Sequence, residues 1–210
     1  MEKQITEKKI MITHLPVMEE YYTIQGEGFN TGTPAYFIRL GGCDVGCHWC
    51  DVKESWEVNN HPLVKINNLI EKANQYPSKT VVITGGEPLM HNLDYLCKAL
   101  QEKKIKIFLE TSGAYSISGK WDWICVSPKK FKAPLQEVLS VAHELKVIIY
   151  NKSDFDWAEQ NAQKISEHCK LFLQPEWDNS NKMLPLIIDY VKQNPQWKIS
   201  LQTHKFINIP

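Results

Sequence analysis

Residues 36–50 read YFIRLGGCDVGCHWC, an apolar run that ends in a glycine pair and three closely spaced cysteines. The first five residues are short on polar groups and rich in aromatic and branched side chains, which predicts a β-strand. Gly41 and Gly42 would end this strand, so the cysteines would lie on the loop at its carboxyl end. Because α/β folds bind ligands at the carboxyl ends of their strands, this loop is the first candidate for a functional site.

Six further apolar runs have the length and composition of strands. They span residues 80–84, 106–110, 123–127, 146–150, 171–174 and 198–201. Runs such as Val81-Val82-Ile83 are apolar without alternation, which is typical of parallel strands that are covered on both faces. The sequence therefore predicts a mostly parallel sheet.

Three stretches between these runs have apolar residues at i, i+3, i+4 and i+7, which places them on one face of a helix. They are Ile66, Leu69, Ile70 and Ala73; Leu93, Leu96, Cys97 and Leu100; and Leu184, Ile187, Ile188 and Val191. Alternating strands and helices predict an α/β fold. Because six or seven strands are fewer than the eight of a closed barrel, we expect an open or partial barrel. No linker divides residues 1–210, so we expect one domain, with residues 1–9 as a flexible lead.

The overall composition favours a small-molecule partner. The chain has 24 Lys plus Arg against 24 Asp plus Glu, and this balance gives no net attraction to nucleic acid or to anionic lipid. The opening MEKQITEKKI is charged, and an apolar run of about 18 residues, as needed to span a membrane, does not occur. We therefore expect a cytoplasmic protein with reduced thiols and with no membrane partner.

Cys43, Cys47 and Cys50 form the constellation that carries the most chemistry. Thiolates are soft ligands suited to iron–sulfur clusters or zinc, and their packing in one loop lets them face a common centre. A structural zinc site normally has four ligands, and His48, held between two cysteines, should point away from that centre. Three ligands would leave one metal position open, as catalytic sites do.

The other three cysteines fit the interior better than a metal site. Cys97 lies on the apolar face of a predicted helix, Cys125 lies inside a predicted strand, and Cys169 precedes another. A free cysteine often behaves as a small buried apolar residue. We therefore expect these three to be core residues.

The spacing of three residues and then two, with Trp49 before the last cysteine, resembles the signature of the radical S-adenosylmethionine (SAM) superfamily. The resemblance implies a [4Fe-4S] cluster on Cys43, Cys47 and Cys50, with SAM bound to the open iron and cleaved to a 5′-deoxyadenosyl radical. The segment Thr84-Gly85-Gly86-Glu87-Pro88 resembles the GGEP motif of the superfamily, in which glycine lets backbone approach SAM. By itself, this glycine pair would be an ordinary strand-to-helix turn.

Further segments narrow the resemblance to one family. They are Tyr22 to Gly28, Arg39 before the cysteine loop, Glu110 to Gly113, Ser127-Pro128-Lys129, Leu173-Gln174-Pro175 and the tail from Gln202 to Pro210. Together they resemble the 7-carboxy-7-deazaguanine synthases, lyases of the queuosine and deazapurine pathway. The resemblance implies a modified, incomplete TIM-like barrel. It also implies conversion of 6-carboxy-5,6,7,8-tetrahydropterin to 7-carboxy-7-deazaguanine with loss of ammonia, through hydrogen abstraction at C6 and ring contraction.

The resemblance also implies a homodimer, an external reductant such as flavodoxin or ferredoxin, and a set of binding residues. For the pterin these are Ile24, Gln25, Gly26, Glu27, Arg39, Thr84, His204 and Pro210. For SAM they are Trp49, Cys50, Asp51, Gly86, Ser127, Pro128, Lys129, Gln174, Pro175, Glu176 and Trp177. Arg39 would pair with the substrate carboxylate, because its planar fork suits that task better than lysine does. The sequence assigns no general acid or base.

One residue departs from the family pattern. The family commonly has Thr or Ser two residues after the third cluster cysteine, where the hydroxyl binds Mg²⁺, but this chain has Val52. Valine offers no oxygen to a hard cation. The resemblance thus implies Mg²⁺ as a cofactor, while Val52 predicts that its usual ligand geometry is lost and that substrate oxygens and water would have to hold it.

Two alternatives remain open from the sequence. An activase that installs a glycyl radical on a partner protein would share the cysteines and the glycine-rich turn, but it would not need Arg39 or Gln25. A structural zinc or electron-transfer module would need a fourth ligand at the cysteine loop. An anaerobic preparation that is brown and bleaches on reduction would separate the cluster enzyme from a colourless zinc protein.

Overall fold

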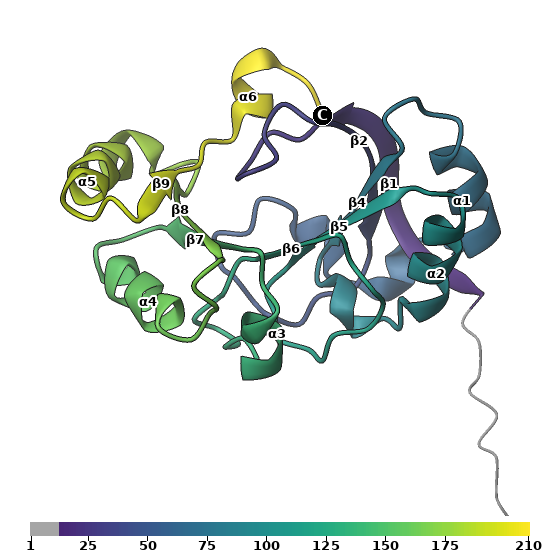
Figure 1. The fold of residues 1–210 in the computed structure, drawn as a ribbon, viewed down its shortest axis with the longest axis horizontal. Coiled ribbons are helices and arrows are strands. Elements are labelled where there is room, and N and C mark those ends of the chain that lie inside the picture. Colours follow the sequence, from purple (N-terminus) through teal and green to yellow (C-terminus); the bar gives the residue numbers. More distant parts are fainter. Residues whose placement is uncertain (1–12) are drawn as a thin grey trace, which may run out of the picture.

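The computed structural model describes residues 13–210, which fold as a nine-stranded sheet with helices packed outside it (Figure 1). The predicted flexible lead, residues 1–9, lies outside the described residues. The strands are β1 (His14–Ile24), β2 (Pro34–Leu40), β3 (Leu63–Lys65), β4 (Thr80–Gly85), β5 (Lys106–Thr111), β6 (Trp123–Val126), β7 (Glu144–Ile149), β8 (Lys170–Pro175) and β9 (Trp197–Ile199).

The strand order is β3-β1-β2-β4-β5-β6-β7-β8-β9. All neighbours from β2 to β9 are parallel, whereas β1 is antiparallel to both β2 and β3. The first and last strands of this order, β3 and β9, do not pair with each other, so the barrel is not closed. The predicted α/β fold with an incomplete, mostly parallel barrel is confirmed.

The carboxyl-terminal segment crosses from β9 back toward β1. Figure 1 shows α6 (Thr203–Ile207) and the chain end above the curved sheet, on the same side as the end of β1. The backbone N–H of Thr203 donates to the carbonyl of Gly26 at 2.9 Å, and the Thr23 hydroxyl donates to the Pro210 carbonyl at 3.2 Å. The last eight residues therefore connect the two ends of the open barrel.

The remaining helices are α1 (Ile66–Ala73), α2 (Asp94–Glu102), α3 (Gln136–Ser140), α4 (Ser153–Ala162) and α5 (Ser180–Gln193). Each of the seven predicted strands overlaps an observed strand, and the three predicted helices correspond to α1, α2 and α5. The expectation that Cys97, Cys125 and Cys169 are core residues is confirmed, because all three are buried and free of disulfides.

The predicted apolar face of α5 is partly wrong. The residues that α5 buries fully are Met183 and Ile187, whereas Leu184 and Ile188 do not pack against the core. The physical reason is that residues 183–188 read MLPLII, so two overlapping faces of the helix have the same apolar spacing. Packing against the sheet selects one of them, and periodicity alone does not.

Strands β1 and β3 were not predicted. The middle of β1 contains Glu19 and Glu20, which interrupt the apolar pattern expected of a strand. Both carboxylates have partners from later parts of the chain. Glu19 pairs with Arg39, and Glu20 accepts from the Tyr36 hydroxyl and pairs with Lys72 of α1. An antiparallel strand near a sheet edge can have a polar face, and β3, with three residues, is too short to give a pattern.

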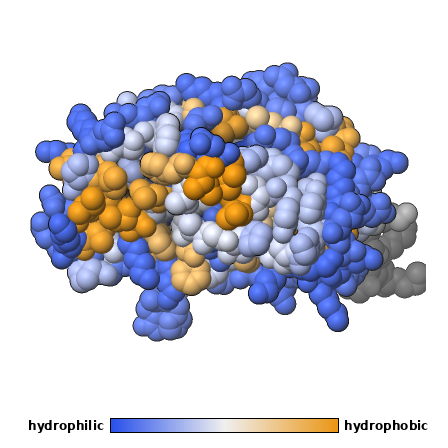
Figure 2. All heavy atoms as spheres, turned by 90° about the horizontal axis from the view of Figure 1, so that it is seen from above, coloured by the Kyte–Doolittle hydropathy of each residue, from blue (hydrophilic) through white to orange (hydrophobic). Residues whose placement is uncertain are grey.

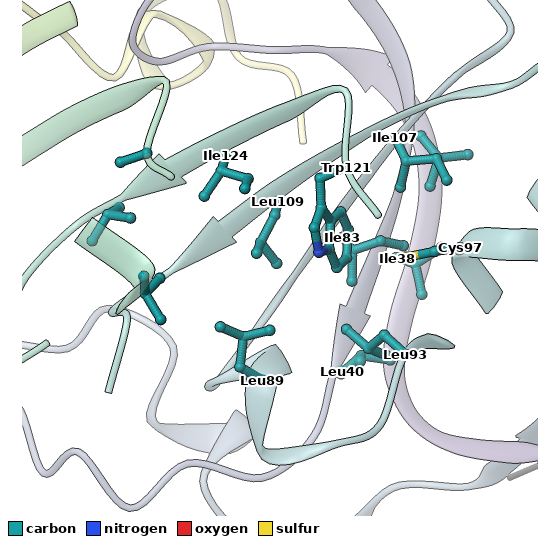
Figure 3. Packing of buried hydrophobic residues seen from close by; sticks show 14 of the residues in the cluster. Ile38, Leu40, Ile83, Leu89, Leu93, Cys97, Ile107, Leu109, Trp121 and Ile124 are labelled. Carbon is teal, nitrogen blue, oxygen red and sulfur yellow. The ribbon is translucent and has the colours of Figure 1, made fainter. Parts of the chain in front are cut away.

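The main core lies between the sheet and the helices α1 to α5 that pack against it. Figure 3 shows Ile38, Ile83, Leu109 and Ile124 on consecutive strands of the sheet, with Leu93 and Cys97 facing them from the α2 side. Ile38, Ile83 and Leu109 have no exposed surface. Since each fully buried aliphatic side chain contributes about 1.5 to 3 kcal/mol, this layer fixes the order and spacing of the strands that form the site.

The outer surface is mostly hydrophilic. Figure 2, seen from the α6 side, shows apolar residues in separate areas among charged and polar ones. The exposed apolar side chains include Phe206 and Ile207 of α6. Within residues 13–210, no helix combines the length and the apolar character needed to cross a membrane.

A matched pair of leucine substitutions tests the core. Leu109→Ala in β5 removes a fully buried side chain and should lower the free energy of unfolding by about 2 to 5 kcal/mol. Leu63→Ala in β3 removes a side chain that is 70% exposed and should change it by less than about 0.5 kcal/mol. Urea unfolding measures both, and equal effects would contradict the described packing.

Candidate active site

The three-cysteine loop is fixed to the carboxyl end of β2 by its own backbone. The Gly42 N–H donates to the Ser55 carbonyl at 2.7 Å, and the Cys43 N–H donates to the Trp56 carbonyl at 3.0 Å. Within the loop, the Cys50 N–H donates to the Cys47 carbonyl at 3.0 Å. These bonds close the loop on itself, so that all three thiols remain on one side of the sheet edge.

The glycine-rich turn after β4 packs directly against this loop. The Gly86 N–H donates to the Leu40 carbonyl at 3.0 Å, and the Glu87 N–H donates to the Gly42 carbonyl at 2.8 Å. A Cβ on Gly86 would lie 2.5 Å from the Gly42 carbonyl oxygen and 2.6 Å from the Cys43 Cβ. Only glycine permits this approach, so the ordinary-turn interpretation of Gly85-Gly86 does not account for the contact.

The Glu87 carboxylate organises the ends of β4 and β5. It is 1% exposed, and its Oε1 accepts from the Leu89 N–H at 3.0 Å and from the Thr111 hydroxyl at 2.6 Å. Its Oε2 accepts from both the N–H and the hydroxyl of Ser112. Because four donors converge on one buried carboxylate, Glu87 determines where these two strand ends lie.

A pocket of about 560 Å³ opens beside the cysteine loop, within the range of roughly 300 to 1,000 Å³ typical of small-molecule sites. Cys43, Cys47 and Cys50 all line it. Burial raises the pKa of the Cys47 thiol to about 11, although Lys129 opposes the rise. Thiols of this kind lose their protons on binding a metal. Three soft ligands at the wall of one pocket fit an iron–sulfur cluster with an open position.

A fourth ligand for a structural zinc is not found at the loop. Cys97, Cys125 and Cys169 lie in the interior and do not line the pocket. The His48 ring packs edge-on against Phe131 and Tyr150, with centroid distances of 5.4 Å and 5.0 Å. Among the described residues, the side chains around the loop therefore favour a three-ligand site.

Most of the sequence-predicted site residues meet in this pocket. Its lining includes Ile24, Gln25, Gly26, Glu27, Arg39, Trp49, Asp51, Thr84, Gly86, Ser127, Lys129, Gln174, His204 and Pro210. Pro128, Pro175, Glu176 and Trp177 do not line it. The Glu176 carboxylate is instead used by the backbone N–H groups of Asp178 and Asn179, at 3.1 Å and 3.0 Å, as a cap for the turn before α5.

Arg39 supplies a positive charge at one end of the pocket. Its Nε donates to the Glu19 Oε1 at 2.6 Å across the β1–β2 pair. Burial lowers the pKa of Arg39, but Tyr21 and Glu19 outweigh burial and raise it above its usual value. The guanidinium is therefore charged at any physiological pH and can bind an anionic group of a ligand.

Lys129 supplies a second positive charge, beside the cysteine loop. Its Nζ donates to the carbonyl and the hydroxyl of Ser127, at 2.7 Å and 2.6 Å, and lies 5.7 Å from the centre of the Trp49 ring. Burial lowers the pKa of Lys129, and the neighbouring Cys47 opposes this effect. The arrangement holds a cation where a bound anionic group would meet the metal loop.

A buried acid–base network forms another part of the wall. Lys146 of β7 pairs with Glu27 at 2.6 Å and with Glu110 at 3.0 Å, and Gln25 and Gln202 complete the network. Burial raises the pKa of Glu27, but Lys146 and its hydrogen bonds outweigh burial and hold it at about 2.

The pocket wall also contains Glu110, Lys146 and Gln202, for which the sequence predicts no role. A usable signal existed for Lys146. It lies in the strand Glu144-Leu145-Lys146-Val147-Ile148-Ile149, where a lysine among buried apolar residues requires a partner. Glu110 opens the segment Glu110 to Gly113 that resembles the family, but that segment did not by itself indicate a role for the Glu110 carboxylate.

The chain end closes the pocket over these groups. A Cβ on Gly26 would lie 2.2 Å from the Nδ1 atom of His204, so the two residues are in close contact. Burial lowers the pKa of His204, and Glu27 opposes this effect. His204 and Pro210 both line the pocket. The segment from His204 to Pro210 thus contributes to the wall of the site.

The residues present do not fit the usual magnesium position. Val52 lines the pocket but offers no oxygen, and the preceding carboxylate, Asp51, pairs with the Lys205 ammonium at 3.0 Å. That ammonium also lies 4.7 Å from the centre of the Trp177 ring. A hard cation needs several oxygen ligands, and this part of the wall presents a valine and a carboxylate that is already paired.

The carboxylate of Glu87 offers a direct test of the site scaffold. Each oxygen of the Glu87 carboxylate accepts from one backbone N–H and one hydroxyl. In Glu87→Gln the NH2 group replaces one of these oxygens, so in either orientation of the amide it faces a backbone N–H that then has no acceptor. We expect it to lower the free energy of unfolding by about 2 to 4 kcal/mol, because a buried charged acceptor and its partners are lost. Glu102→Gln, at the exposed end of α2, is the matched control and should have little effect. Equal unfolding curves for the two variants would show that Glu87 does not organise the strand ends.

Comparison with known proteins places this geometry in a family. Residues 37–124 match the Radical SAM superfamily. The 7-carboxy-7-deazaguanine synthase of Flavobacterium psychrophilum is 57% identical over 93% of this chain and 93% of its own length. The enzyme of the same name from Synechocystis sp. is 46% identical over 96% of both chains.

Structural similarity agrees with the sequence matches. The crystal structure of QueE from Escherichia coli superposes with a TM-score of 0.81 at 30% identity, covering 91% of this chain and 95% of that one. The shared fold extends over most of the chain and is not limited to the cysteine loop. The chain therefore belongs to the 7-carboxy-7-deazaguanine synthase family of the radical SAM superfamily.

Proposed function

We propose that this protein converts 6-carboxy-5,6,7,8-tetrahydropterin to 7-carboxy-7-deazaguanine, with release of ammonia, by radical SAM chemistry. The observation that carries the proposal is a single pocket that joins the three-cysteine loop to a fixed guanidinium and a carboxylate network. An activase would not require Arg39 or the Gln25 segment, and a zinc module would not require the pocket. Membership of the family removes both alternatives.

As a radical SAM enzyme, the protein uses a [4Fe-4S] cluster and SAM. Cys43, Cys47 and Cys50 would hold the cluster through their thiolates, which leaves one iron for SAM. When bound, these groups supply the 5′-deoxyadenosyl radical that removes hydrogen from C6 of the pterin. The described residues have the separate tasks of holding both ligands and of keeping water away from the radical.

The SAM side of the pocket contains both backbone and charged groups. Gly86 lines the pocket beside the cysteine loop, and Lys129 offers a cation next to Ser127. Trp49 presents an aromatic ring on the same side. We assign SAM binding to this side, together with Cys50, Asp51 and Gln174, which line the pocket. Pro128, Pro175, Glu176 and Trp177 lie outside the lining, so any part they have in SAM binding is to support the residues that line it.

The pterin side lies across the pocket, toward β1, β2 and the chain end. Arg39 would pair with the C6 carboxylate of the substrate, while Thr84, its neighbour in register on β4, would donate or accept a hydrogen bond. Ile24, Gln25, Gly26 and Glu27 form the adjoining wall. The segment with His204 and Pro210 would exclude water once the substrate is bound.

We infer from the family resemblance that the protein acts as a homodimer and receives its electron from an external carrier such as flavodoxin or ferredoxin. The exposed Phe206 and Ile207, 63% and 57% accessible, support the dimer because they leave apolar surface available to a second copy. Light scattering of the purified protein would measure its mass directly.

Product formation tests the proposed reaction. Reconstituted protein is incubated anaerobically with SAM, a reductant and 6-carboxytetrahydropterin, and the mixture is analysed by mass spectrometry. We expect 7-carboxy-7-deazaguanine to accumulate well beyond the amount of enzyme. SAM cleavage without this product would leave the radical SAM chemistry and contradict the proposed substrate.

Substitution of Arg39 tests the orientation of the substrate. Arg39→Lys keeps the charge but loses the planar fork, so the KM for the pterin should rise about tenfold or more while the affinity for SAM is unchanged. Lys198→Arg, at an exposed residue of β9, makes the opposite exchange away from the pocket and serves as the control, which should leave the KM for the pterin unchanged. An unchanged KM would show that Arg39 does not bind the carboxylate.

Removal of magnesium tests the consequence of Val52. We infer that this enzyme does not need Mg²⁺ at residue 52, because neither the valine nor the paired Asp51 can ligate it well. After treatment with a chelating resin, kcat/KM should change less than about twofold, since no oxygen ligand is lost. Val52→Thr restores a hydroxyl and should make turnover respond to added Mg²⁺. A strict requirement in the unsubstituted protein would mean that other oxygens hold the ion.

A further inference from the structure

Lys146 lies in β7, where every residue except Lys146 itself and Glu144 is apolar, and its side chain is 4% exposed. It donates to the Glu27 Oε2 at 2.6 Å and to the Glu110 Oε2 at 3.0 Å. A buried ion pair contributes little to stability compared with apolar residues of the same volume. Folding alone therefore gives no reason for a lysine at this point in the pocket wall.

The second oxygen of each carboxylate is also held in place. The Glu27 Oε1 accepts from the Gln202 side chain at 2.9 Å, and the Glu110 Oε1 accepts from the Gln25 side chain at 3.2 Å. The Gln25 Oε1 in turn accepts from the Glu27 N–H at 3.2 Å. Lys146, Glu27, Gln25 and Glu110 form a closed ring of hydrogen bonds, and Gln202 is attached to this ring through Glu27. All five residues line the pocket.

The ring still has unused acceptor capacity. An ionised carboxylate accepts about four hydrogen bonds and donates none. Glu27 accepts from Lys146 and Gln202, and Glu110 accepts from Lys146, Gln25 and the Cys125 thiol. Each carboxylate therefore retains acceptor capacity, and both side chains remain partly exposed in the pocket wall. Two carboxylates and one ammonium leave the ring with a net negative charge, which favours a ligand edge made of N–H donors over one made of oxygen acceptors.

The proposed substrate has such an edge. The pyrimidine ring of a pterin carries an exocyclic amine and a ring N–H side by side, and neutral N–H groups hydrogen-bond more strongly to carboxylates than to neutral acceptors. For this recognition the carboxylates must be ionised and aligned. Burial opposes ionisation, so a buried counter-charge is required.

We propose that Lys146 is a positioning residue for substrate recognition, which aligns the ionised carboxylates of Glu27 and Glu110 to accept the N–H edge of the pterin ring. Lys146 acts through the two carboxylates and does not itself touch the substrate. The inference rests on the function proposed above. It gives a task to a buried lysine that cluster chemistry and SAM binding do not use.

The other ionisable groups around Lys146 do not remove its charge. They are Glu27, Glu110 on β5, Cys125 on β6, Lys129 beyond β6, Glu144 on β7 and His204 on α6. Burial lowers the pKa of Lys146, but Cys125 and the three carboxylates outweigh burial and raise it well above its usual value. Burial also raises the pKa of Glu144 to about 7, although Lys146 opposes the rise. Lys146 therefore stays positively charged and interacts electrostatically with Glu27, Glu110 and Glu144.

Replacement of Lys146 by methionine provides the test. Equilibrium binding of 6-carboxytetrahydropterin is measured anaerobically, without reductant, for the unsubstituted protein, for Lys146→Met and for the exposed control Lys198→Met. We expect Lys146→Met to bind the pterin at least tenfold more weakly, with an unchanged affinity for SAM. The control should bind both ligands normally.

The pH dependence separates positioning from a purely structural role. With Lys146 present, the pKa of Glu27 is about 2, so Glu27 stays ionised from pH 6 to 8. Without Lys146 the largest opposition to burial is lost and only Gln202 and His204 remain, so the pKa of Glu27 rises. The ratio of variant to unsubstituted dissociation constants should therefore increase as the pH falls from 8 to 6, and the ratio cancels the ionisation of the ligand itself. A flat ratio near one would overturn the inference.

Two further variants guard against loss of the fold. Lys146→Arg keeps the positive charge and should recover most of the affinity and the flat ratio. Glu27→Gln combined with Lys146→Met keeps the net charge of the ring, and in this background the loss caused by Lys146→Met should be smaller than in the unsubstituted chain. An equal loss in both backgrounds would mean that Lys146 acts independently of Glu27, which contradicts the proposal.

The result also distinguishes this inference from the proposed function. If the unsubstituted protein cleaves SAM but binds no pterin, the proposed substrate is wrong and the inference falls with it. If the unsubstituted protein binds pterin and Lys146→Met binds it equally well, only the inference is overturned.

Discussion

The close backbone contact between residues 40–42 and residues 85–87 is the constraint on which the site depends. Two hydrogen bonds, from Gly86 to Leu40 and from Glu87 to Gly42, join the turn after β4 to the start of the cysteine loop. The same few residues then begin the thiol loop, end β4 and present the buried carboxylate that holds β5. Because these bonds are between main-chain atoms, the position of the thiols is set by the sheet, and loop side chains can vary without moving it.

The charged side chains of the pocket are also held in fixed positions by their neighbours. Arg39, Lys129 and Lys146 lie on β2, beyond β6 and on β7, and each is held by oxygen atoms of its own surroundings. The carboxylates of Glu27 and Glu110 pair with Lys146, and Arg39 pairs with Glu19, so cations and anions of the wall are held against each other. In a buried pocket such pairs interact more strongly than at the surface, and the wall can therefore orient a polar heterocycle without large movements.

The local sequence predicted much of this structure because its signals and the packing agree. The apolar runs at β4, β5 and β7 are short and bounded by glycine or polar residues, and the cysteine loop follows a strand directly. Strand β1 was not predicted because Glu19 and Glu20 interrupt its apolar pattern. Both are stabilised in the strand by ion pairs with residues far away in the sequence, Arg39 and Lys72. The buried face of α5 was only partly predicted, because its apolar residues are contiguous and fit more than one face of a helix.

The same limit applies to the site. Residues in motifs, such as Cys43 and Arg39, could be assigned from the sequence because neighbouring positions identify them. Lys146 and Glu110 are far apart in the chain and meet only through the sheet order, which places β5, β6 and β7 side by side. Val52, in contrast, could be interpreted from the sequence alone, because a side chain without oxygen fits Mg²⁺ poorly. The ion pair between Asp51 and Lys205 agrees with this prediction.

The central claim is that three thiolates hold a [4Fe-4S] cluster with one iron open to SAM. Electron paramagnetic resonance of the anaerobically reduced protein, recorded with and without SAM, tests it most directly. The account predicts a cluster signal that changes when SAM is added, because the cosubstrate then ligates the open iron. An identical spectrum in both samples, or a protein that binds zinc in place of iron, would contradict the account.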